Sequence, residues 1–162
     1  MIDFQISDKP FNEEEITEIL IYFDDYFIPK ISDRKNIIEY ARKLSSNATF
    51  ILAKNKRKIV GFTAFYFNPV PKTTYLTLIA TDRNFQGIGI GKSMICKLIE
   101  FCTTHNSAGI LLEMRANNLK LFNFYNSLGF EVKEKFPSSL NGETRYHMYL
   151  PIKNNRPWME HQ

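Results

Sequence analysis

The chain has few cysteines, and they cannot form a disulfide framework. Its 162 residues include only Cys96 and Cys102. They lie six residues apart on one predicted helix, where they point to different faces and cannot pair with each other. This pattern indicates a reducing, cytoplasmic setting. We expect both thiols to be packed in a core rather than to act as nucleophiles, because neither lies in an activating sequence context.

Histidine is scarce as well, and the sequence has no long apolar run. His105, His147 and His161 are scattered without the spacing of metal ligands, so we predict no metal. No G-x-S-x-G nucleophile elbow occurs. No apolar run approaches membrane-spanning length, and the N-terminus lacks a basic segment ahead of an apolar one. We therefore expect a soluble, cytoplasmic protein with no membrane partner.

The chain is rich in bulky apolar residues. Apolar residues make up 44% of the sequence, with 14 phenylalanines and eight tyrosines. A chain of this length can bury a core of its own, and we predict one domain over residues 1–152 with a polar tail at 153–162. The net charge of +4 is mixed in sign and permits an anionic ligand. Without a concentrated basic face it does not favour nucleic acid.

The first third of the sequence predicts a short strand and two helices. Residues 4–7 favour a strand, and Asn12 has the position of a helix N-cap, with Glu15 completing a capping box. We expect Pro29 to end this helix and a second helix to begin near Ser32 or Asp33. Apolar residues at helical spacing are expected to face the core in these helices: Ile16, Ile19, Leu20 and Phe23, then Ile37, Ile38, Ala41 and Leu44.

Strands dominate the rest of the chain. β-branched and aromatic residues predict a hairpin, a long third strand, a helix, a strand, a short helix closed by Gly129, and two final strands. Their expected ranges are 49–54, 59–67, 73–81, 93–105, 110–115, 117–128, 130–136 and 145–150. This order predicts an α/β sandwich in one domain, with a mixed, mostly antiparallel sheet flanked by helices.

One loop carries the clearest chemical signal, the run Gln86-Gly87-Ile88-Gly89-Ile90-Gly91-Lys92 between a strand and a helix. Alternate glycines let backbone N–H groups approach a ligand closely, and a helix N-terminus behind them favours an anion, most often phosphate. A nucleotide P-loop requires glycine where Gln86 stands, and the dinucleotide fingerprint requires a different glycine spacing. The loop therefore predicts a phosphate site of another kind.

Two segments together resemble a known family. Gln86-x-x-Gly89-x-Gly91 is similar to the Q/R-x-x-G-x-G/A segment of the GCN5-related N-acetyltransferase (GNAT) superfamily. Residues 112–118, followed by Tyr125 and by Leu128-Gly129-Phe130, resemble its second signature with the family's spacing. The resemblance extends from about residue 4 to residue 150, and the two motifs occur in the right order on the expected elements.

The resemblance implies acetyl-coenzyme A as co-substrate and no metal. The pyrophosphate would lie on the amides of the glycine loop, Gln86, Gly87, Ile88, Gly89, Ile90, Gly91 and Lys92. The pantetheine arm would lie between the strands at 75–81 and 110–115, bonded to the backbone of Leu78, Ile79 and Ala80. Asn118 would help to fix the arm near the thioester.

The implied reaction is direct attack of a free amine on the thioester, which makes the chain an acetyl-coenzyme A-dependent N-acyltransferase. Tyr125 matches the family tyrosine and is our candidate acid for the leaving thiolate; the alternative is a core tyrosine whose hydroxyl bonds to backbone. Glu113 is our candidate base, because an alkylamine with a pKa near ~10 must lose a proton. It could instead order its strand or pair with Arg115, in which case a water held by Tyr75 or Thr77 would be the base.

The acceptor is less defined. Asp25 and Tyr26 place acid beside aromatic surface that could receive a cationic amine, with Tyr75 as a further candidate; the favoured alternative is that Asp24 and Asp25 are simply solvated. The match around Glu113 favours a protein N-terminus, and small amines stay open. Alternative hypotheses are a non-catalytic acyl-coenzyme A sensor on the same fold and, last, a nucleic-acid-binding domain. A homodimer is possible, and the tail at Pro157-Trp158 could belong to its interface.

Overall fold

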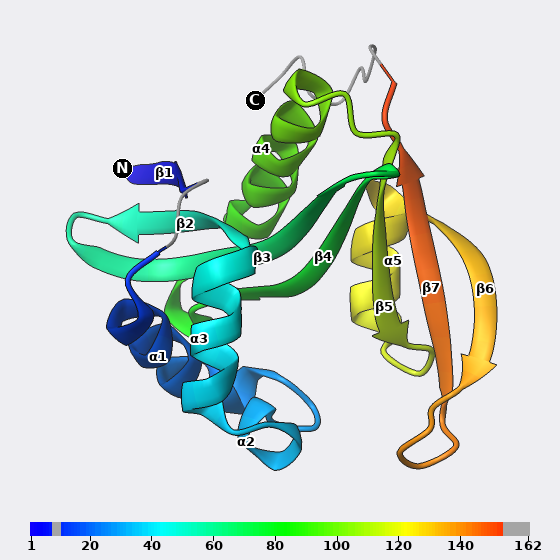
Figure 1. Cartoon of the computed structure of the whole chain (residues 1–162), viewed down its shortest axis with the longest axis horizontal. Helices are drawn as coiled ribbons and strands as arrows, with labels where there is room; N and C mark the ends of the chain where they lie inside the picture. The colour runs from blue at the N-terminus through cyan, green and yellow to red at the C-terminus, as the bar shows by residue number, and fades with distance from the viewer. Residues whose placement is uncertain (8–10, 154–162) are drawn as a thin grey trace. The chain divides into compact units, whose positions relative to one another are not determined.

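The computed structural model describes residues 1–7 and 11–153, and the expected tail from residue 154, with Pro157 and Trp158, lies outside them. Its seven strands form one sheet in the order β1-β2-β3-β4-β5-β7-β6 (Figure 1). β4 and β5 run parallel, whereas β1–β2, β2–β3, β5–β7 and β6–β7 run antiparallel. The prediction of a mixed, mostly antiparallel sheet with flanking helices is confirmed.

The chain folds into two compact units. The N-terminal unit comprises residues 1–66 and 78–97, and the C-terminal unit comprises residues 67–77 and the chain from residue 98. β3, β4 and α4 each pass from one unit into the other. Among the described residues, no helix is long and apolar enough to cross a bilayer.

The N-terminal unit begins with β1 (Ile2–Ser7) and α1 (Glu13–Tyr22). Asn12 caps α1 by accepting the Glu14 N–H at 2.8 Å, as expected. The helix ends seven residues before Pro29, so that expectation is wrong. Instead Asp24 begins a 3₁₀ turn over Asp24–Tyr26, and its carboxylate accepts the Ser32 N–H at 2.8 Å. Aspartate favours such local bonds over a continued helix.

The predicted second helix is two helices, α2 (Ile31–Arg34) and α3 (Ile37–Asn47). Asn36 starts α3 afresh, because its side chain accepts the Glu39 N–H at 3.1 Å. Ala41 and Leu44 are buried, as expected. Ile38 is 57% exposed and does not face the core, so that expectation is wrong. Tyr40 is the buried residue of this turn instead.

Strands β2 (Thr49–Asn55), β3 (Lys58–Pro69) and β4 (Lys72–Thr81) follow the predicted hairpin and third strand closely. Phe50, Leu52 and Phe62 join the core cluster with α1 and α3, which pack together (Figure 1). On the opposite face, Thr63 contacts the Met94 sulfur at 3.5 Å. Both faces are therefore covered in this part of the sheet, which explains the nearly continuous apolar runs.

The C-terminal unit contains β5 (Gly109–Arg115), α5 (Leu119–Ser127), β6 (Glu131–Pro137) and β7 (Thr144–Pro151). Gly129 follows α5 with φ +98°, as expected of a helix terminator. The Phe122 and Tyr146 rings meet with centroids 5.9 Å apart, so α5 covers the face of β7 that carries Tyr146 (Figure 1). Arg145 and His147 flank Tyr146 in the strand and therefore point to the opposite face.

Candidate active site

The glycine loop lies in the N-terminal unit between the end of β4 and α4 (Ile90–Thr104). Gly87 has φ +84° and Gly89 has φ +88°, and a Cβ at either would meet no atom within 4 Å. The positive φ angles therefore favour glycine at both positions, although there is room for a larger side chain. The Ser93 N–H bonds to the Gly89 carbonyl at 2.9 Å, so the helix begins three residues earlier than predicted. The amides of Ile90, Gly91 and Lys92 consequently belong to its first turn and lack intrahelical partners.

Two anchors hold the loop on the sheet. The Gln86 side chain donates from Nε2 to the Thr81 carbonyl at 2.9 Å. Asp82 is 1% exposed and accepts hydrogen bonds from the Tyr22 hydroxyl and from the Asn84 N–H at 2.9 Å, with Lys58 Nζ at 3.3 Å. The Tyr22 bond is the main cause that lowers the pKa of Asp82 below its ordinary value. These hydrogen bonds hold the loop in its conformation before a ligand binds.

The backbone expected to bind pantetheine is the stretch Leu78, Ile79 and Ala80 of β4. The side chains of Leu78 and Ala80 belong to the core of the N-terminal unit. Strands β4 and β5 pair at three positions, from Thr74–Ile110 to Leu76–Leu112. Leu78, Ile79 and Ala80 lie beyond the last of these pairs. The backbone role of this stretch stays a prediction.

The expected acceptor residues of the N-terminal unit contact the segment that leads into the loop. The guanidinium of Arg83 lies 3.9 Å from the centroid of the Tyr26 ring and 3.6 Å from Asp25. The Arg83 N–H also bonds to the Tyr26 hydroxyl at 3.1 Å. Arg83 therefore contacts both residues, and the Asp25 side chain is still 57% exposed to solvent. Tyr75 is half-buried on β4 opposite Leu111, and its acceptor role, like theirs, stays a prediction.

Asn118 and Tyr125 are on α5 of the C-terminal unit. The Asn118 side-chain oxygen caps the helix by accepting the Leu121 N–H at 3.1 Å, so a ligand would meet its amide nitrogen. Tyr125 is 3% exposed and packs against Phe130, with ring centroids 5.3 Å apart. Burial raises the pKa of its phenol, which therefore keeps its proton at neutral pH. Within the described chain no partner bonds to this hydroxyl, which leaves a donor for a ligand.

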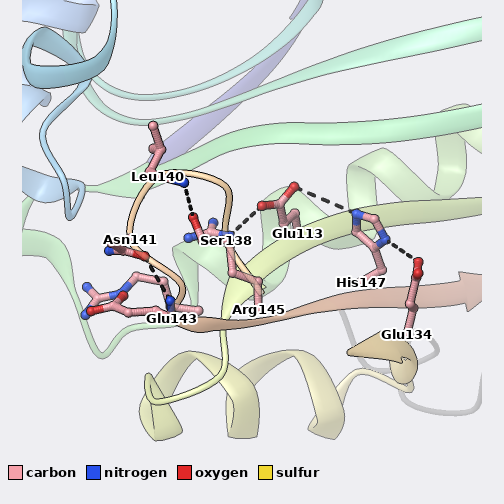
Figure 2. Close-up of polar contacts among 9 residues, drawn as sticks. Glu113, Glu134, Ser138, Leu140, Asn141, Glu143, Arg145 and His147 are labelled. Atoms are coloured by element: carbon pink, nitrogen blue, oxygen red, sulfur yellow. Dashed lines mark hydrogen bonds and ion pairs between the residues drawn. The ribbon is translucent and has the colours of Figure 1, made fainter. Parts of the chain in front are cut away.

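Glu113 lies on β5 in a line of charged side chains that crosses three strands (Figure 2). Its carboxylate pairs with the Arg145 guanidinium on β7, and its other oxygen lies 3.7 Å from His147 Nε2. His147 Nδ1 lies 3.1 Å from Glu134 on β6. The expected alternative of a Glu113–Arg115 pair is wrong, because Arg115 instead lies 3.2 Å from Glu143. Glu113 has a different arginine as its partner.

The candidate acid and base occupy opposite faces of the same strands. Glu113 shares its face with Arg145 and His147, whereas α5, which carries Tyr125, covers the Tyr146 face. Leu112 and Met114 alternate with Glu113 and are buried. The nitrogen that loses a proton and the sulfur that gains one are bonded to the same carbonyl carbon, and the structure does not bring the Glu113 carboxylate and the Tyr125 hydroxyl together at one point.

Four residues of these clusters were not anticipated from the sequence: Asp82, Glu134, Arg145 and His147. Arg145 and His147 alternate along a predicted strand, which places them on one face. Only the register of three strands brings Glu113 and Glu134 to them. Among described residues, no group of His, Cys, Asp or Glu could hold a metal ion. Cys96 and Cys102 are buried and form no disulfide, as expected of core residues.

Comparison with known proteins places these features in a family. The model of the Acetyltransferase (GNAT) family matches residues 12–130. N-acetylaspartate synthetase from Xenopus tropicalis is 29% identical over 100 residues, 62% of this chain and 36% of that protein. The [ribosomal protein bS18]-alanine N-acetyltransferase of Salmonella typhimurium is 33% identical over 78 residues, 46% of this chain and 53% of that protein. The chain thus spans only about a third to a half of these relatives.

A solved structure shares the fold over nearly the full length. A chain of the NatC complex bound to Gag peptide and CoA matches with a TM-score of 0.75 and 20% identity, covering 94% of this chain and 99% of that chain. The matched model covers most of the sequence, and the chain belongs to the Acetyltransferase (GNAT) family.

Proposed function

We propose that the chain transfers an acetyl group from acetyl-coenzyme A to a primary amine. The observation that carries this proposal is the loop in which Gly87 and Gly89 adopt positive φ directly before the first turn of α4. Amides of a helix N-terminus together with a glycine-rich turn suit a diphosphate. The family supports acetyl transfer, and the similar NatC structure is of a complex bound to CoA.

In this proposal the amides of residues 86–92 hold the diphosphate, and the backbone of Leu78, Ile79 and Ala80 bonds to the pantetheine arm. Asn118 steadies the arm through its amide nitrogen. Asp82 and the Gln86 side chain fix the loop before the ligand arrives, so little ordering is needed on binding.

In this proposal Glu113 is the base for the acceptor and Tyr125 is the acid for the leaving thiolate. Glu113 accepts a proton from the acceptor ammonium, and the freed amine forms a bond to the thioester carbonyl carbon. The carbon–sulfur bond breaks, and the phenol of Tyr125 gives its proton to the departing thiolate. The new amide nitrogen loses its second proton, which returns through water to the Tyr125 phenolate. Burial raises the pKa of Tyr125, so the phenol still carries its proton at neutral pH when the thiolate forms.

The acceptor is a peptide N-terminus or a small amine, and the named activities of the relatives include both kinds. Asp25 and Tyr26 are proposed to lie beside the acceptor, with Tyr75 on β4. Because Arg83 engages both Asp25 and Tyr26, the acceptor region would be tied to the segment that precedes the diphosphate loop.

The catalytic domain is proposed to span residues 1–152, since β7 ends at Pro151. Two free, buried cysteines agree with a reducing, cytoplasmic setting. Assembly into a homodimer is proposed from the family resemblance.

The test is a panel of acceptors assayed for release of the coenzyme thiol. Peptides with different N-termini, aspartate and simple alkylamines are offered with acetyl-coenzyme A, and turnover with at least one is expected. Binding of acetyl-coenzyme A by calorimetry, without turnover across the panel, would favour the acyl-coenzyme A sensor instead. Absence of binding would overturn both functions.

A further inference from the structure

The imidazole of His147 stands between two carboxylates. Glu134 Oε2 lies 3.1 Å from Nδ1, and Glu113 Oε2 lies 3.7 Å from Nε2 (Figure 2). The register explains this placement, because His147 is opposite Glu113 in the β5–β7 ladder and opposite Glu134 in the β6–β7 ladder. The Phe136 ring packs on the imidazole with centroids 4.5 Å apart, which fixes the plane of the ring.

This arrangement selects one tautomer of the neutral imidazole. An ionised carboxylate only accepts hydrogen bonds, so the 3.1 Å contact to Glu134 requires the proton on Nδ1. Nε2 then carries a lone pair directed at Glu113. At 3.7 Å the two groups do not share a hydrogen bond, and an approach of less than about 1 Å would form one when Glu113 carries a proton to donate.

Glu113 needs such a neighbour if it is the base. Its carboxylate is held in an ion pair with Arg145, so a proton taken from the acceptor must move on before that pair re-forms. Histidine changes charge near pH ~6.5 in its ordinary state and exchanges protons readily with water. His147 is partly exposed and so has access to solvent.

We propose that His147 is a proton-relay and positioning residue for the transfer reaction; this rests on the proposed function with Glu113 as base. Glu113 takes the proton of the acceptor ammonium and passes it to Nε2 of neutral His147. Glu113 returns to its carboxylate form beside Arg145, and the imidazolium releases the proton to water. Glu134 keeps Nδ1 protonated throughout, so that each cycle begins with a free Nε2.

The first test is the pH dependence of kcat/KM. The groups that face His147 are Glu113 from β5, Glu134 from β6 and Arg145 from its own strand β7. Protonated His147 cannot accept a further proton, so wild-type activity should fall on the acid side as the imidazole becomes charged. His147→Gln should lower kcat by about tenfold and remove that acid limb. His105→Gln is the matched control, since His105 stacks on Phe101 away from this cluster, and it should keep the wild-type profile.

Two further readouts separate a relay from a structural role. Free imidazole in the buffer should restore much of the rate of His147→Ala, which a purely structural loss would not allow. Nitrogen-15 spectra of the ring, assigned by comparison with His147→Gln, should show the Nδ1–H tautomer in the wild-type protein. The Glu134→Gln variant should shift this tautomer toward Nε2–H.

The outcomes are distinguishable. If the wild-type protein turns over an acceptor but His147→Gln keeps its rate and its acid limb, the relay is overturned and the proposed function stands. An Nε2–H tautomer in the wild-type protein would also overturn the relay. If the wild-type protein releases no thiol with any acceptor, the proposed function fails and the relay fails with it.

Discussion

The glycine loop at residues 86–92 and the charged face of β5, β6 and β7 achieve local order in different ways. In the loop, the groups that matter are backbone amides, and a continuous run of seven residues contains them all. On the charged face, the groups are side chains from three strands: Glu113 on β5 pairs with Arg145 on β7, and Glu134 on β6 lies 3.1 Å from His147 on β7 (Figure 2). Function in the loop therefore depends on conformation, whereas on the charged face it depends on register.

The sharpest test of this contrast lies outside both regions, at Tyr125. Replacing Tyr125 with Phe removes only the hydroxyl, and kcat should fall by about 10²-fold because the thiolate loses its proton donor. The affinity for acetyl-coenzyme A, measured by calorimetry, should change by less than threefold. An unchanged kcat would remove Tyr125 from the mechanism.

On the charged face, Glu113→Gln should lower kcat on the order of tenfold, since water can partly replace the base. Glu143→Gln is the matched control, because Glu143 also pairs with an arginine, Arg115, in the same unit. Steady-state assays should show the loss only for Glu113→Gln. Equal losses in both variants would mean that charge balance, rather than a base at residue 113, explains the effect.

In the loop, Gly89→Ala should weaken acetyl-coenzyme A binding by about tenfold, because a Cβ at φ +88° is strained by about 1–2 kcal/mol and the amides move to relieve it. Gly142→Ala in the β6–β7 turn is the control: its φ is +74° and its surroundings are equally open. Calorimetry should report similar losses of stability but a loss of affinity in Gly89→Ala alone. Retained affinity in Gly89→Ala would contradict the assignment of the loop.

The smallest expected effect is one of stability, at the anchor of the loop. Asp82→Asn should lower the free energy of unfolding by about 1–3 kcal/mol at pH 7, since the charged hydrogen bonds of a buried carboxylate are lost. The pKa of Asp82 is lowered in the folded protein, so its contribution is complete above pH ~4 and disappears as the pH falls through the folded value. Urea unfolding at pH 7, 5 and 3 should show that the difference in unfolding free energy between wild type and Asp82→Asn becomes small at pH 3. If the difference in unfolding free energy persists at pH 3, the geometry of the Asp82 side chain rather than its charge is responsible.

The sequence was informative where structure is local. Alternating glycines before a helix, the Asn12 cap and the hairpin strands depend on neighbours within a few residues, and all were found in the structure. The errors arose where competing local bonds were missed: Asp24 ends α1 early and Asn36 restarts α3, which turns Ile38 outward. The partners of Glu113 could not be predicted, because nothing in the order of residues gives the register between β5, β7 and β6.

The burial of both cysteines has a practical consequence for activity assays of this protein. Cys102 is fully enclosed, with its sulfur 3.2 Å from the Thr74 hydroxyl, and burial raises the pKa of its thiol, so little of it is reactive thiolate. Cys96 is similarly shielded. A disulfide dye mixed with the native protein will consequently report only sulfur liberated from the donor. A slow background increase in absorbance then measures the amount of protein that has unfolded and exposed its cysteines.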